Sequence, residues 1–354
     1  MLIGINLLYL IPGKVGGTET YARELIPHLA VGNQLIIFCG RETASTFKDS
    51  KNIQVVALPI YSSNRMARLV VEQTLLPIMA AKYKIEVLLS LGYSAPLIHP
   101  CPSVVTIHDL NWYYHPEDFS LVNRLMWKIL TILSAKFSDH VITDSSASAK
   151  SIMSVIGLQS SKVTSLLHAT PGVINTPVKK NTRPYLFTVL ANYPHKNLKT
   201  LLQAFEILSK ANPELDLVVC GLGKQASSTK RIKYLGYITR QELASLYKGA
   251  LAFVFPSAYE GFGYPVLEAM SYGAPVISSS AYSLAEVVGD GGILVDALDV
   301  SGYVHAISSI ISSAKLRQQL IKRGYNRALE LEWDRTAKLT NKVLSDAYSR
   351  SKAN

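Results

Sequence analysis

The chain has 354 residues, of which 48% are hydrophobic, and it carries a formal net charge of +11. This length and apolar content can bury a substantial core and favour two domains. The three cysteines give no sign of a disulfide framework or a metal site and fit a reducing cytosol. The positive charge indicates an anionic partner, which could be a nucleotide, a lipid surface or nucleic acid.

Residues 1–12, MLIGINLLYLIP, are apolar but lack a basic leader and a small-residue cleavage site, so they predict a buried strand rather than a signal sequence. Short apolar runs then alternate with helical patterns, which is typical of a doubly wound parallel sheet. The runs are LIGINLLYL, QLIIFCG, IQVVALPI, EVLLSL, SVVTIHDL, HVITDS and VTSLLH. No apolar run reaches the ~18 residues that a spanning helix needs.

A segment rich in Pro, Thr and Asn, residues 169–184, interrupts this rhythm and predicts a linker. The alternation restarts with YLFTVL, LDLVVCG, RIKYLGY, LAFVFPS, PVISSS and GILVD. We therefore predict an α/β protein of two Rossmann-like doubly wound domains, 1–172 and 185–332, joined by 173–184, with a ligand in the cleft between them. Residues 333–354 predict a C-terminal helix that crosses back to the first domain.

Residues 119–137, FSLVNRLMWKILTILSAKF, predict an amphipathic helix with basic residues among its apolar ones. Such a helix can lie in the headgroup region of an anionic membrane. The alternative, which we favour for this helix, is a core helix that covers the first sheet, because most apolar stripes are core. Arg65 and Arg68 on either side of Met66 offer a second basic contact for lipid.

Two carboxylates, Glu260 and Glu268, flank a glycine-rich turn in SAYEGFGYPVLEAMSYGAPV. Paired carboxylates suggest glycoside cleavage. However, LAFVFPS predicts a strand and PVLEAMSY a short helix, with Pro265 in its first turn and Gly273 at its end, so the turn lies where open α/β sheets bind ligands. The N-terminus of a helix carries an effective positive charge and unpaired backbone N–H groups, so this one predicts a phosphate-binding site. We interpret the two carboxylates as hydrogen-bond acceptors for the hydroxyls of a sugar and a ribose. The alternative is that Glu260 caps a turn and Glu268 is a solvated helix residue.

The segment YEGFGYPVLEAMSYGAPVISS closely resembles the donor-binding E-x7-E segment of retaining glycosyltransferases of family 4, which have the GT-B fold. The resemblance extends through PGKVGGTETYARELIPHL, TIHDLNWYYHPEDF, PHKNLKTLLQAF, RIKYLGYITRQELASLY and SLAEVVGDGGILVD. The HDL and HPEDF arrangement resembles mannosyltransferases of polysaccharide assembly. The resemblance implies a retaining hexosyltransferase that moves a sugar from a nucleotide-sugar donor to a glycan or polyprenyl-linked acceptor. GDP-mannose is the first candidate for the donor.

The resemblance also implies roles for single residues. Glu268 would bind the ribose, and Glu260 would contact hydroxyls of the transferred sugar. Lys196 would face the donor diphosphate, where a point charge suits a phosphate leaving group. His108, followed by Asp109, would lie near the sugar and the acceptor, although a lone histidine after a strand is more often packed.

The remaining implied contacts are with the donor. They come from Gly16, Gly17, Tyr237, Ile238, Gly261, Phe262 and Gly263. An arginine that many relatives carry just before the lysine is missing from LANYPHKN. Lys196 would then share the diphosphate with His195, Asn192 or Lys14.

Other chemistries fit the sequence less well. No Asp-x-Asp pair occurs, so we expect no metal and no cofactor besides the nucleotide-sugar substrate. No G-x-G-x-x-G supports a dehydrogenase, and scattered Lys and Arg disfavour nucleic acid. A nucleotide-sugar epimerase of the same fold and a non-catalytic nucleotide-sugar binding subunit stay open. We expect a cytoplasmic protein, peripheral on the inner face of the plasma membrane.

Overall fold

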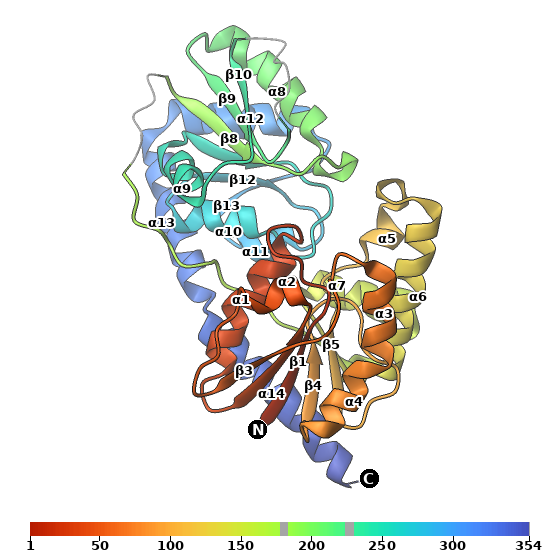
Figure 1. The fold of residues 1–354 in the computed structure, drawn as a ribbon. Coiled ribbons are helices and arrows are strands. Elements are labelled where there is room, and N and C mark those ends of the chain that lie inside the picture. The colour runs from red at the N-terminus through yellow and green to blue at the C-terminus, as the bar shows by residue number, and fades with distance from the viewer. Residues whose placement is uncertain (178–182, 224–229, 354) are drawn as a thin grey trace. The chain divides into compact units, whose positions relative to one another are not determined.

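The computed structural model describes residues 1–177, 183–223 and 230–353 (Figure 1). They form two compact units, Met1–His168 with Trp333–Asn354, and Ala169–Glu332. Residues 178–182, part of the predicted linker, lie outside the described residues.

The first unit is built on a seven-stranded sheet whose described pairs are all parallel, in the order β3-β2-β1-β4-β5-β6-β7. The chain builds one side of the sheet from β1 to β3 and the other from β4 to β7, so the direction of winding changes between β1 and β4. The strands are β1 (Leu2–Leu7), β2 (Gln34–Cys39), β3 (Ile53–Ala57), β4 (Val87–Ser90), β5 (Ser103–Thr106), β6 (His140–Thr143) and β7 (Val163–Ser165).

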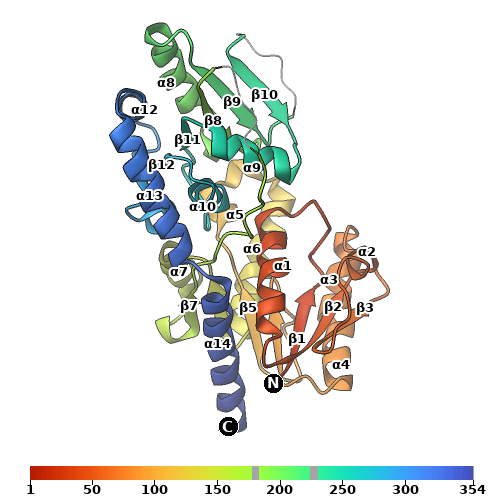
Figure 2. The ribbon, with the colours of Figure 1, turned by 90° about the vertical axis from the view of Figure 1, so that its left-hand side faces the viewer.

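Helices cover this sheet, and the last helix of the chain is among them. α14 lies beside α1 (Figure 2), and its Tyr348 hydroxyl donates to Glu86 Oε1 at 2.8 Å. The helices are α1 (Gly17–Leu29), α2 (Arg41–Ala44), α3 (Arg65–Gln73), α4 (Leu75–Lys82), α5 (Asn111–Tyr114), α6 (Leu121–Phe137), α7 (Ser146–Ile152) and α14 (Trp333–Ala353), with short turns η1 (Pro116–Asp118), η2 (Met153–Gly157) and η3 (Ser160–Lys162).

The second unit has a six-stranded sheet, again parallel, in the order β10-β9-β8-β11-β12-β13. Its direction of winding changes between β8 and β11. The strands are β8 (Tyr185–Val189), β9 (Asp216–Cys220), β10 (Ile232–Gly236), β11 (Ala252–Phe255), β12 (Val276–Ser279) and β13 (Gly292–Val295); the helices are η4 (Pro194–Lys196), α8 (Leu198–Ala211), α9 (Arg240–Gly249), α10 (Tyr264–Ser271), α11 (Leu284–Val288), α12 (Val300–Ser312) and α13 (Ala314–Glu330).

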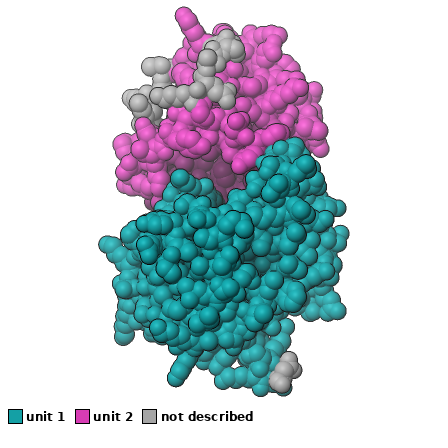
Figure 3. All heavy atoms as spheres, turned by 45° about the vertical axis from the view of Figure 1, so that its right-hand side comes forward, with its two compact units in different colours: residues 1–168, 333–354 teal, residues 169–332 magenta. Residues whose placement is uncertain are grey.

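The two units, coloured separately in Figure 3, confirm the prediction of two doubly wound α/β folds. Every apolar run that predicts a strand contains one. The reason is that a parallel strand covered by helices on both faces must be apolar on both faces, which produces short continuous hydrophobic runs. In the second unit, Leu186, Leu217 and Val254 of the sheet pack with Leu201 and Ile307 of the helices in one core.

The helix predicted at 119–137 forms as α6, but the core assignment is wrong for its first half. Leu125 is 57% exposed and Ile129 is 47% exposed. The buried residues of α6 are instead the small ones, Thr131, Ser134 and Ala135. Small side chains allow a helix to approach a sheet closely. Trp127 and Ile132 are partly buried and pack against the core, whereas Leu125 and Ile129 lie on the outer face.

The second predicted basic contact for lipid also needs correction. Arg65 is exposed on α3, but Arg68 is only 8% exposed. Burial lowers the pKa of Arg68, and the nearby Glu72 carboxylate opposes this shift. Arg68 therefore belongs to the interior and is not available to a headgroup. In the part of the chain that the structure describes, no helix is both long and apolar enough to cross a membrane.

Candidate functional site

The loops after β8 and β11 leave the second sheet side by side at its carboxyl edge, because these strands are parallel neighbours. This is the switch point at which open α/β sheets bind ligands. The first loop carries Lys196 and the second carries Glu260. The backbone joins them, since the His195 carbonyl accepts a hydrogen bond from Ala258 N at 2.8 Å.

Lys196 and Glu260 form an ion pair at this switch point. Lys196 Nζ donates to Glu260 Oε1 at 2.7 Å, and the two side chains are 17% and 13% exposed. The sequence predicted separate partners for them, the diphosphate and the sugar. In the structure each neutralises the other instead, so a donor that binds both side chains has to replace the charge partner of each.

Gly263 shapes the start of α10 and could hardly be replaced. Its φ is +111°, and a Cβ would lie 2.6 Å from Leu284 Cδ2. Pro265 lies in the first turn of α10, and Gly273 follows its end with a φ of 76°, as predicted. The loop before the helix is held by Ser283, whose hydroxyl oxygen lies 2.6 Å from the Glu260 carbonyl oxygen and 2.9 Å from that of Phe262. The N-terminus of α10 therefore has a defined position beside Lys196 and Glu260.

Glu268 lies near the middle of α10 and is partly exposed. Protein nevertheless surrounds its carboxyl group, and this desolvation raises the pKa of Glu268 to about 7. The Tyr247 hydroxyl donates to Glu268 Oε2 at 3.2 Å and favours the ionised form. A further hydroxyl donor would stabilise the carboxylate, so the alternative of an ordinary solvated helix residue is not what the structure shows.

The other residues predicted to bind the sugar donor in this unit differ in their exposure. The His195 ring is buried, stacks on Tyr193 with centroids 5.6 Å apart, and meets the edge of Tyr259. Tyr237, with 89% of its surface exposed, and Ile238 follow β10 and line a cavity of about 600 Å³.

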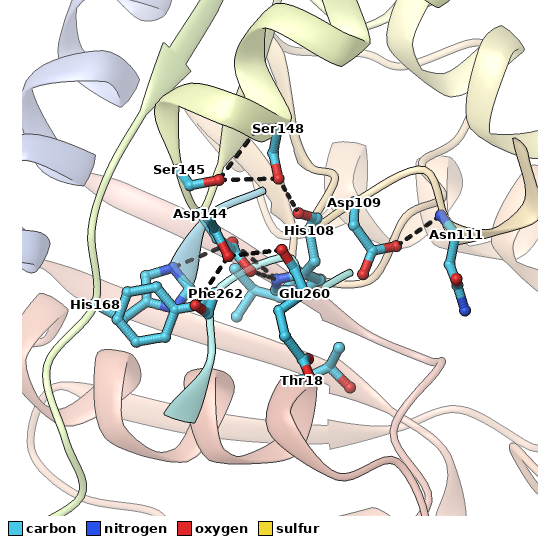
Figure 4. A network of polar contacts seen from close by, with 12 residues as sticks. Thr18, His108, Asp109, Asn111, Asp144, Ser145, Ser148, His168, Glu260 and Phe262 are labelled. Carbon is cyan, nitrogen blue, oxygen red and sulfur yellow. Dashed lines mark hydrogen bonds and ion pairs between the residues drawn. The ribbon is translucent and has the colours of Figure 1, made fainter. Parts of the chain in front are cut away.

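In the first unit, His108 follows β5 and is buried (Figure 4). Its Nδ1 lies 2.8 Å from Asp144 Oδ2, and its Nε2 lies 3.1 Å from the Leu91 carbonyl oxygen. Both partners are acceptors, so both ring nitrogens must donate and the ring carries a positive charge. Burial alone would lower the pKa of His108, but the Asp144 carboxylate outweighs it and raises that pKa above its ordinary value.

Asp144 is shared with a second histidine. His168 Nε2 lies 3.2 Å from Asp144 Oδ1, and its ring stacks on Tyr21, with centroids 4.4 Å apart, and on Trp333, with centroids 5.8 Å apart. Burial would raise the pKa of Asp144, but the two histidines lower it well below the usual range. The sequence analysis missed Asp144 and His168. A signal existed, because each follows a strand closely, β6 or β7, and the carboxyl ends of parallel neighbours share one edge.

Asp109 and the glycine loop lie at the same edge of the first sheet. Asp109 Oδ1 accepts a hydrogen bond from Asn111 N at 3.1 Å at the start of α5, and the Ser148 hydroxyl donates to the His108 carbonyl oxygen at 3.0 Å (Figure 4). Gly16 precedes α1 with a φ of 61°, a conformation that favours glycine, and Gly17 is the first residue of the helix. These residues therefore shape backbone turns.

Comparison with known proteins identifies the chain. The model of the family described as Glycosyltransferase Family 4 matches residues 15–166, and that of Glycosyl transferases group 1 matches residues 174–327. The chain belongs to the family 4 glycosyltransferases. The predicted family is confirmed, and each match falls within one of the two compact units.

Relatives of this glycosyltransferase include two O-antigen enzymes. It is 29% identical to O-antigen chain mannosyltransferase B of Escherichia coli over 67% of the chain and 75% of the relative. It is also 29% identical to O-antigen chain mannosyltransferase RfbU of Salmonella typhimurium, over 58% of the chain and 60% of the relative. Sucrose-phosphate synthase from Thermosynechococcus elongatus has the same fold, with a TM-score of 0.78 at 19% identity over 99% of this chain and 100% of that one. The predicted GT-B fold class is confirmed.

Proposed function

We propose that this glycosyltransferase moves mannose from a nucleotide-sugar donor to a growing polysaccharide or lipid-linked glycan, with retention of the anomeric configuration and without a metal. GDP-mannose is the first candidate for the donor. The observation that carries the proposal is the group at the switch point of the second sheet, namely Lys196, Glu260 and the N-terminus of α10, followed by Glu268. A nucleotide sugar presents a diphosphate between two sets of hydroxyls, which these groups match in charge. The O-antigen mannosyltransferases support mannose as the sugar.

Donor binding would divide the Lys196–Glu260 ion pair. A diphosphate oxygen replaces Glu260 as the partner of Lys196, and hydroxyls of the sugar replace Lys196 as the partner of Glu260. The N-terminus of α10 adds an effective positive half charge toward the diphosphate. The ribose hydroxyls donate to Glu268, whose carboxylate gains the hydrogen bonds that burial denies it.

The chemical step needs no acid from the protein. The bond between the anomeric carbon and the diphosphate oxygen breaks as Lys196 and the N-terminus of α10 stabilise the departing charge. The acceptor hydroxyl forms the new bond on the same face, and its proton passes to the diphosphate. Retention follows from attack on the face from which the leaving group departs.

The test is a melting-temperature panel with nucleoside diphosphates and nucleotide sugars, followed by a transfer assay with the donor that binds best. Ligand at 100 times its Kd stabilises a protein by about 2.7 kcal/mol, so the correct nucleotide should raise the melting temperature clearly. We expect GDP and GDP-mannose to give the largest shifts. Stabilisation by no nucleoside diphosphate would overturn the proposal, and turnover of donor without an acceptor to an epimeric sugar nucleotide would favour an epimerase.

We also propose that the enzyme works on the inner face of an anionic membrane. Leu121 and Val122 at the start of α6 are 83% and 78% exposed, and Met66 of α3 is 68% exposed. The Arg65 guanidinium joins these helices by donating to Asn123 Oδ1 at 2.8 Å. Apolar side chains beside basic ones suit an anionic headgroup layer, and the net charge of +11 adds attraction.

Vesicle flotation tests the membrane proposal. Binding should require anionic lipid and decrease with salt, and Leu121→Glu with Val122→Glu should abolish it. Leu298→Glu is the matched control, because Leu298 is 72% exposed in the second unit. Absence of binding at low salt, or equal binding of both variants, would contradict the proposal.

A further inference from the structure

A third buried carboxyl group of the molecule, that of Glu72, takes no part in the proposed chemistry. Glu72 is the penultimate residue of α3, and 2% of its surface is exposed. Its Oε1 accepts hydrogen bonds from Asn6 Nδ2 at 2.8 Å and from the Ser94 hydroxyl at 3.0 Å. Its Oε2 is buried and has no hydrogen-bond partner among the described residues. Burial raises the pKa of Glu72, and the two hydrogen bonds offset only part of this cost.

The two donors lie where the winding of the first sheet changes direction. Asn6 belongs to β1 and Ser94 follows β4, and the carboxyl ends of these parallel neighbours share one edge of the sheet. Asn6 Nδ2 also donates to the hydroxyl oxygen of Ser90, the last residue of β4, at 3.1 Å. Glu72 therefore connects the loop after β4 to the end of β1 and to α3.

The same loop is held at further points. Gln73, the last residue of α3, donates from Nε2 to the Ala95 carbonyl oxygen at 3.1 Å and accepts from Leu97 N at 2.9 Å. From α6, the Ser134 hydroxyl oxygen accepts a hydrogen bond from Ala95 N at 3.0 Å. Side chains of two helices thus fix the path of residues 94–97.

The beginning of this loop contacts His108. The Leu91 carbonyl oxygen lies 3.1 Å from His108 Nε2, and the Tyr93 ring packs against the His108 ring with centroids 5.2 Å apart. Tyr93 has a φ of 63°, and a Cβ on Gly92 would lie 2.2 Å from the Tyr9 ring. A non-glycine residue with such a φ costs free energy and persists only where the surrounding structure enforces it. The hydrogen bonds from α3 and α6 provide that enforcement.

We propose that Glu72 is a positioning residue for His108. Its Oε1 holds Ser94 and so keeps the loop in the conformation in which the Leu91 carbonyl accepts from His108 Nε2. Both hydrogen-bond partners of Glu72 are neutral donors, so the position requires an acceptor oxygen rather than a negative charge. The inference rests on the proposed function for its effect on turnover, but on the contacts alone for its effect on the His108 ring.

Two substitutions of Glu72 separate the acceptor from the charge. Glu72→Gln keeps an oxygen that can accept from both donors, and its kcat should lie within about threefold of the wild type. Glu72→Met has a similar length but no such oxygen, and it should lower kcat about 10- to 100-fold, because small displacements at a reacting centre are costly. The KM for the donor and the affinity for GDP should change less than about twofold, since the predicted donor site lies in the second unit.

Titration of the histidine ring signals by NMR measures the effect on His108 directly. The Leu91 carbonyl is among the groups that raise the pKa of His108, so this pKa should be lower in Glu72→Met and unchanged in Glu72→Gln. His108→Ala identifies the signal among the eight histidines. The other groups that face His108 are Asp109, Asp144, His168, Tyr21 and Tyr93.

Glu86→Met is the matched control. Glu86 precedes β4 at the opposite edge of the same sheet, where it accepts from Leu2 N at 2.7 Å and from the Tyr348 hydroxyl at 2.8 Å. The substitution also removes an acceptor of two hydrogen bonds, so it should lower the melting temperature. It should leave kcat and the pKa of His108 unchanged, because Glu86 does not bond to the loop.

The outcomes decide between positioning and simple stability. If Glu72→Met does not fold, Ser94→Ala, which leaves Glu72 bonded to Asn6, should lower kcat about 3- to 10-fold and lower the pKa of His108. Unchanged kcat and an unchanged pKa of His108 in the folded variant would overturn the proposal, as would equal losses in Glu72→Gln and Glu72→Met. If no nucleoside diphosphate stabilises the protein, the proposed function fails, and the His108 titration still decides whether Glu72 holds the loop.

Discussion

Asp144 in the first unit and Glu268 in the second are carboxylates surrounded by protein, yet their pKa values shift in opposite directions. Asp144 lies between His108 and His168, and these charges hold its pKa well below the usual range. Glu268 has the neutral hydroxyl of Tyr247 as its described hydrogen-bond partner, and burial raises its pKa to about 7. Burial is common to both residues, and the charge of the neighbours decides the direction of the shift.

The difference indicates two roles. A carboxylate that is already paired can hold other side chains in position before any ligand arrives, as Asp144 does for His108. At Glu268 burial outweighs the favourable effects of the Tyr247 hydroxyl and the Arg240 charge, so ionisation of this carboxyl group destabilises the folded protein, and a ligand that supplies hydrogen bonds relieves this. The first unit thus contributes preorganised geometry, while the second contributes a site whose stability should respond to its ligand.

Replacing Asp144 should have the largest effect on stability. Asp144→Asn breaks a buried ion pair, which costs about 3–5 kcal/mol. Because the pKa of His108 is raised in the folded protein, the stability that this residue contributes is present below pH ~6.5 and is lost as the pH rises through the folded pKa. The stability that Asp144 contributes is lost only as the pH falls below ~4. The deficit in the free energy of unfolding should therefore be larger at pH 6 than at pH 9.

Denaturant titrations at both pH values measure this deficit. Asp346→Asn is the control, since Asp346 is exposed on α14. Asp109, His168, Tyr21 and Tyr93 also face His108, so the His108→Ala variant identifies the share of the pH dependence that belongs to His108 itself. A deficit that grows toward pH 9 would contradict the charge pair.

Replacing Glu268 should stabilise the protein at high pH. The pKa of Glu268 is raised from 4.5 to about 7 in the folded protein. The contribution of Glu268 to the free energy of unfolding is therefore fully present below pH ~4.5 and is lost as the pH rises through 7. Glu268→Gln avoids this loss and should exceed the wild type by up to about 3 kcal/mol at pH 9, but not at pH 4.5. Its affinity for nucleoside diphosphates should fall at the same time.

Thermal melts across this pH range and calorimetric titration with GDP provide the two measurements. Glu206→Gln, an exposed carboxylate on α8, should show neither effect. The ribose assignment is wrong if the Glu268 variant binds the nucleoside diphosphate as tightly as the wild type does.

Lys196→Ala should reduce turnover about 100-fold, the loss typical of one group that stabilises a developing charge. The substitution also leaves the Glu260 carboxylate, which is 13% exposed, without this partner, so a melting curve of the variant accompanies the kinetics. The matched control is Lys199→Ala, which removes an exposed lysine at the start of α8. Steady-state kinetics decide, and turnover within twofold of the wild type would remove Lys196 from the mechanism.

Glu260→Gln should have the smallest and the least intuitive effect. The Lys196–Glu260 pair is neutral overall, so removing the carboxylate charge leaves Lys196 free to attract an anion. We expect the affinity for GDP to rise a few-fold, about 1 kcal/mol at most, while transfer of the sugar declines. Calorimetry and kinetics on the same preparation test this, and weaker GDP binding would show that Glu260 does not compete for Lys196.

The sequence analysis located the turn and the helix of the candidate site in the second unit because their signals are local. Gly263, Pro265 and Gly273 mark the start and end of α10 within a dozen residues, and the strand before them is a continuous apolar run. The pairing of Lys196 with Glu260 could not be predicted in the same way. The two residues are 64 positions apart, and only the parallel neighbours β8 and β11 bring them together.

In the first unit, His108 could be named only because its segment resembles a family, and its partners were missed. Asp144 is 36 residues from His108, and a single aspartate or histidine after a strand is an ordinary feature of a sequence. The same limit applies to α6, where the pattern predicted the helix but not the face that is buried. Side-chain periodicity shows which residues share a face, whereas the neighbouring elements decide whether that face is covered.

By itself, therefore, the sequence determined the strands, the doubly wound class and the glycine-rich turn before α10, because helix ends, apolar runs and glycine turns depend on neighbours along the chain. The tertiary structure decided the charge states of the site residues. His108 is positively charged, and Glu268 is only partly ionised near pH 7, because of the groups that surround each side chain. Desolvation and charge pairing act through space, and the residues that produce them here come from separate strands and helices of each unit.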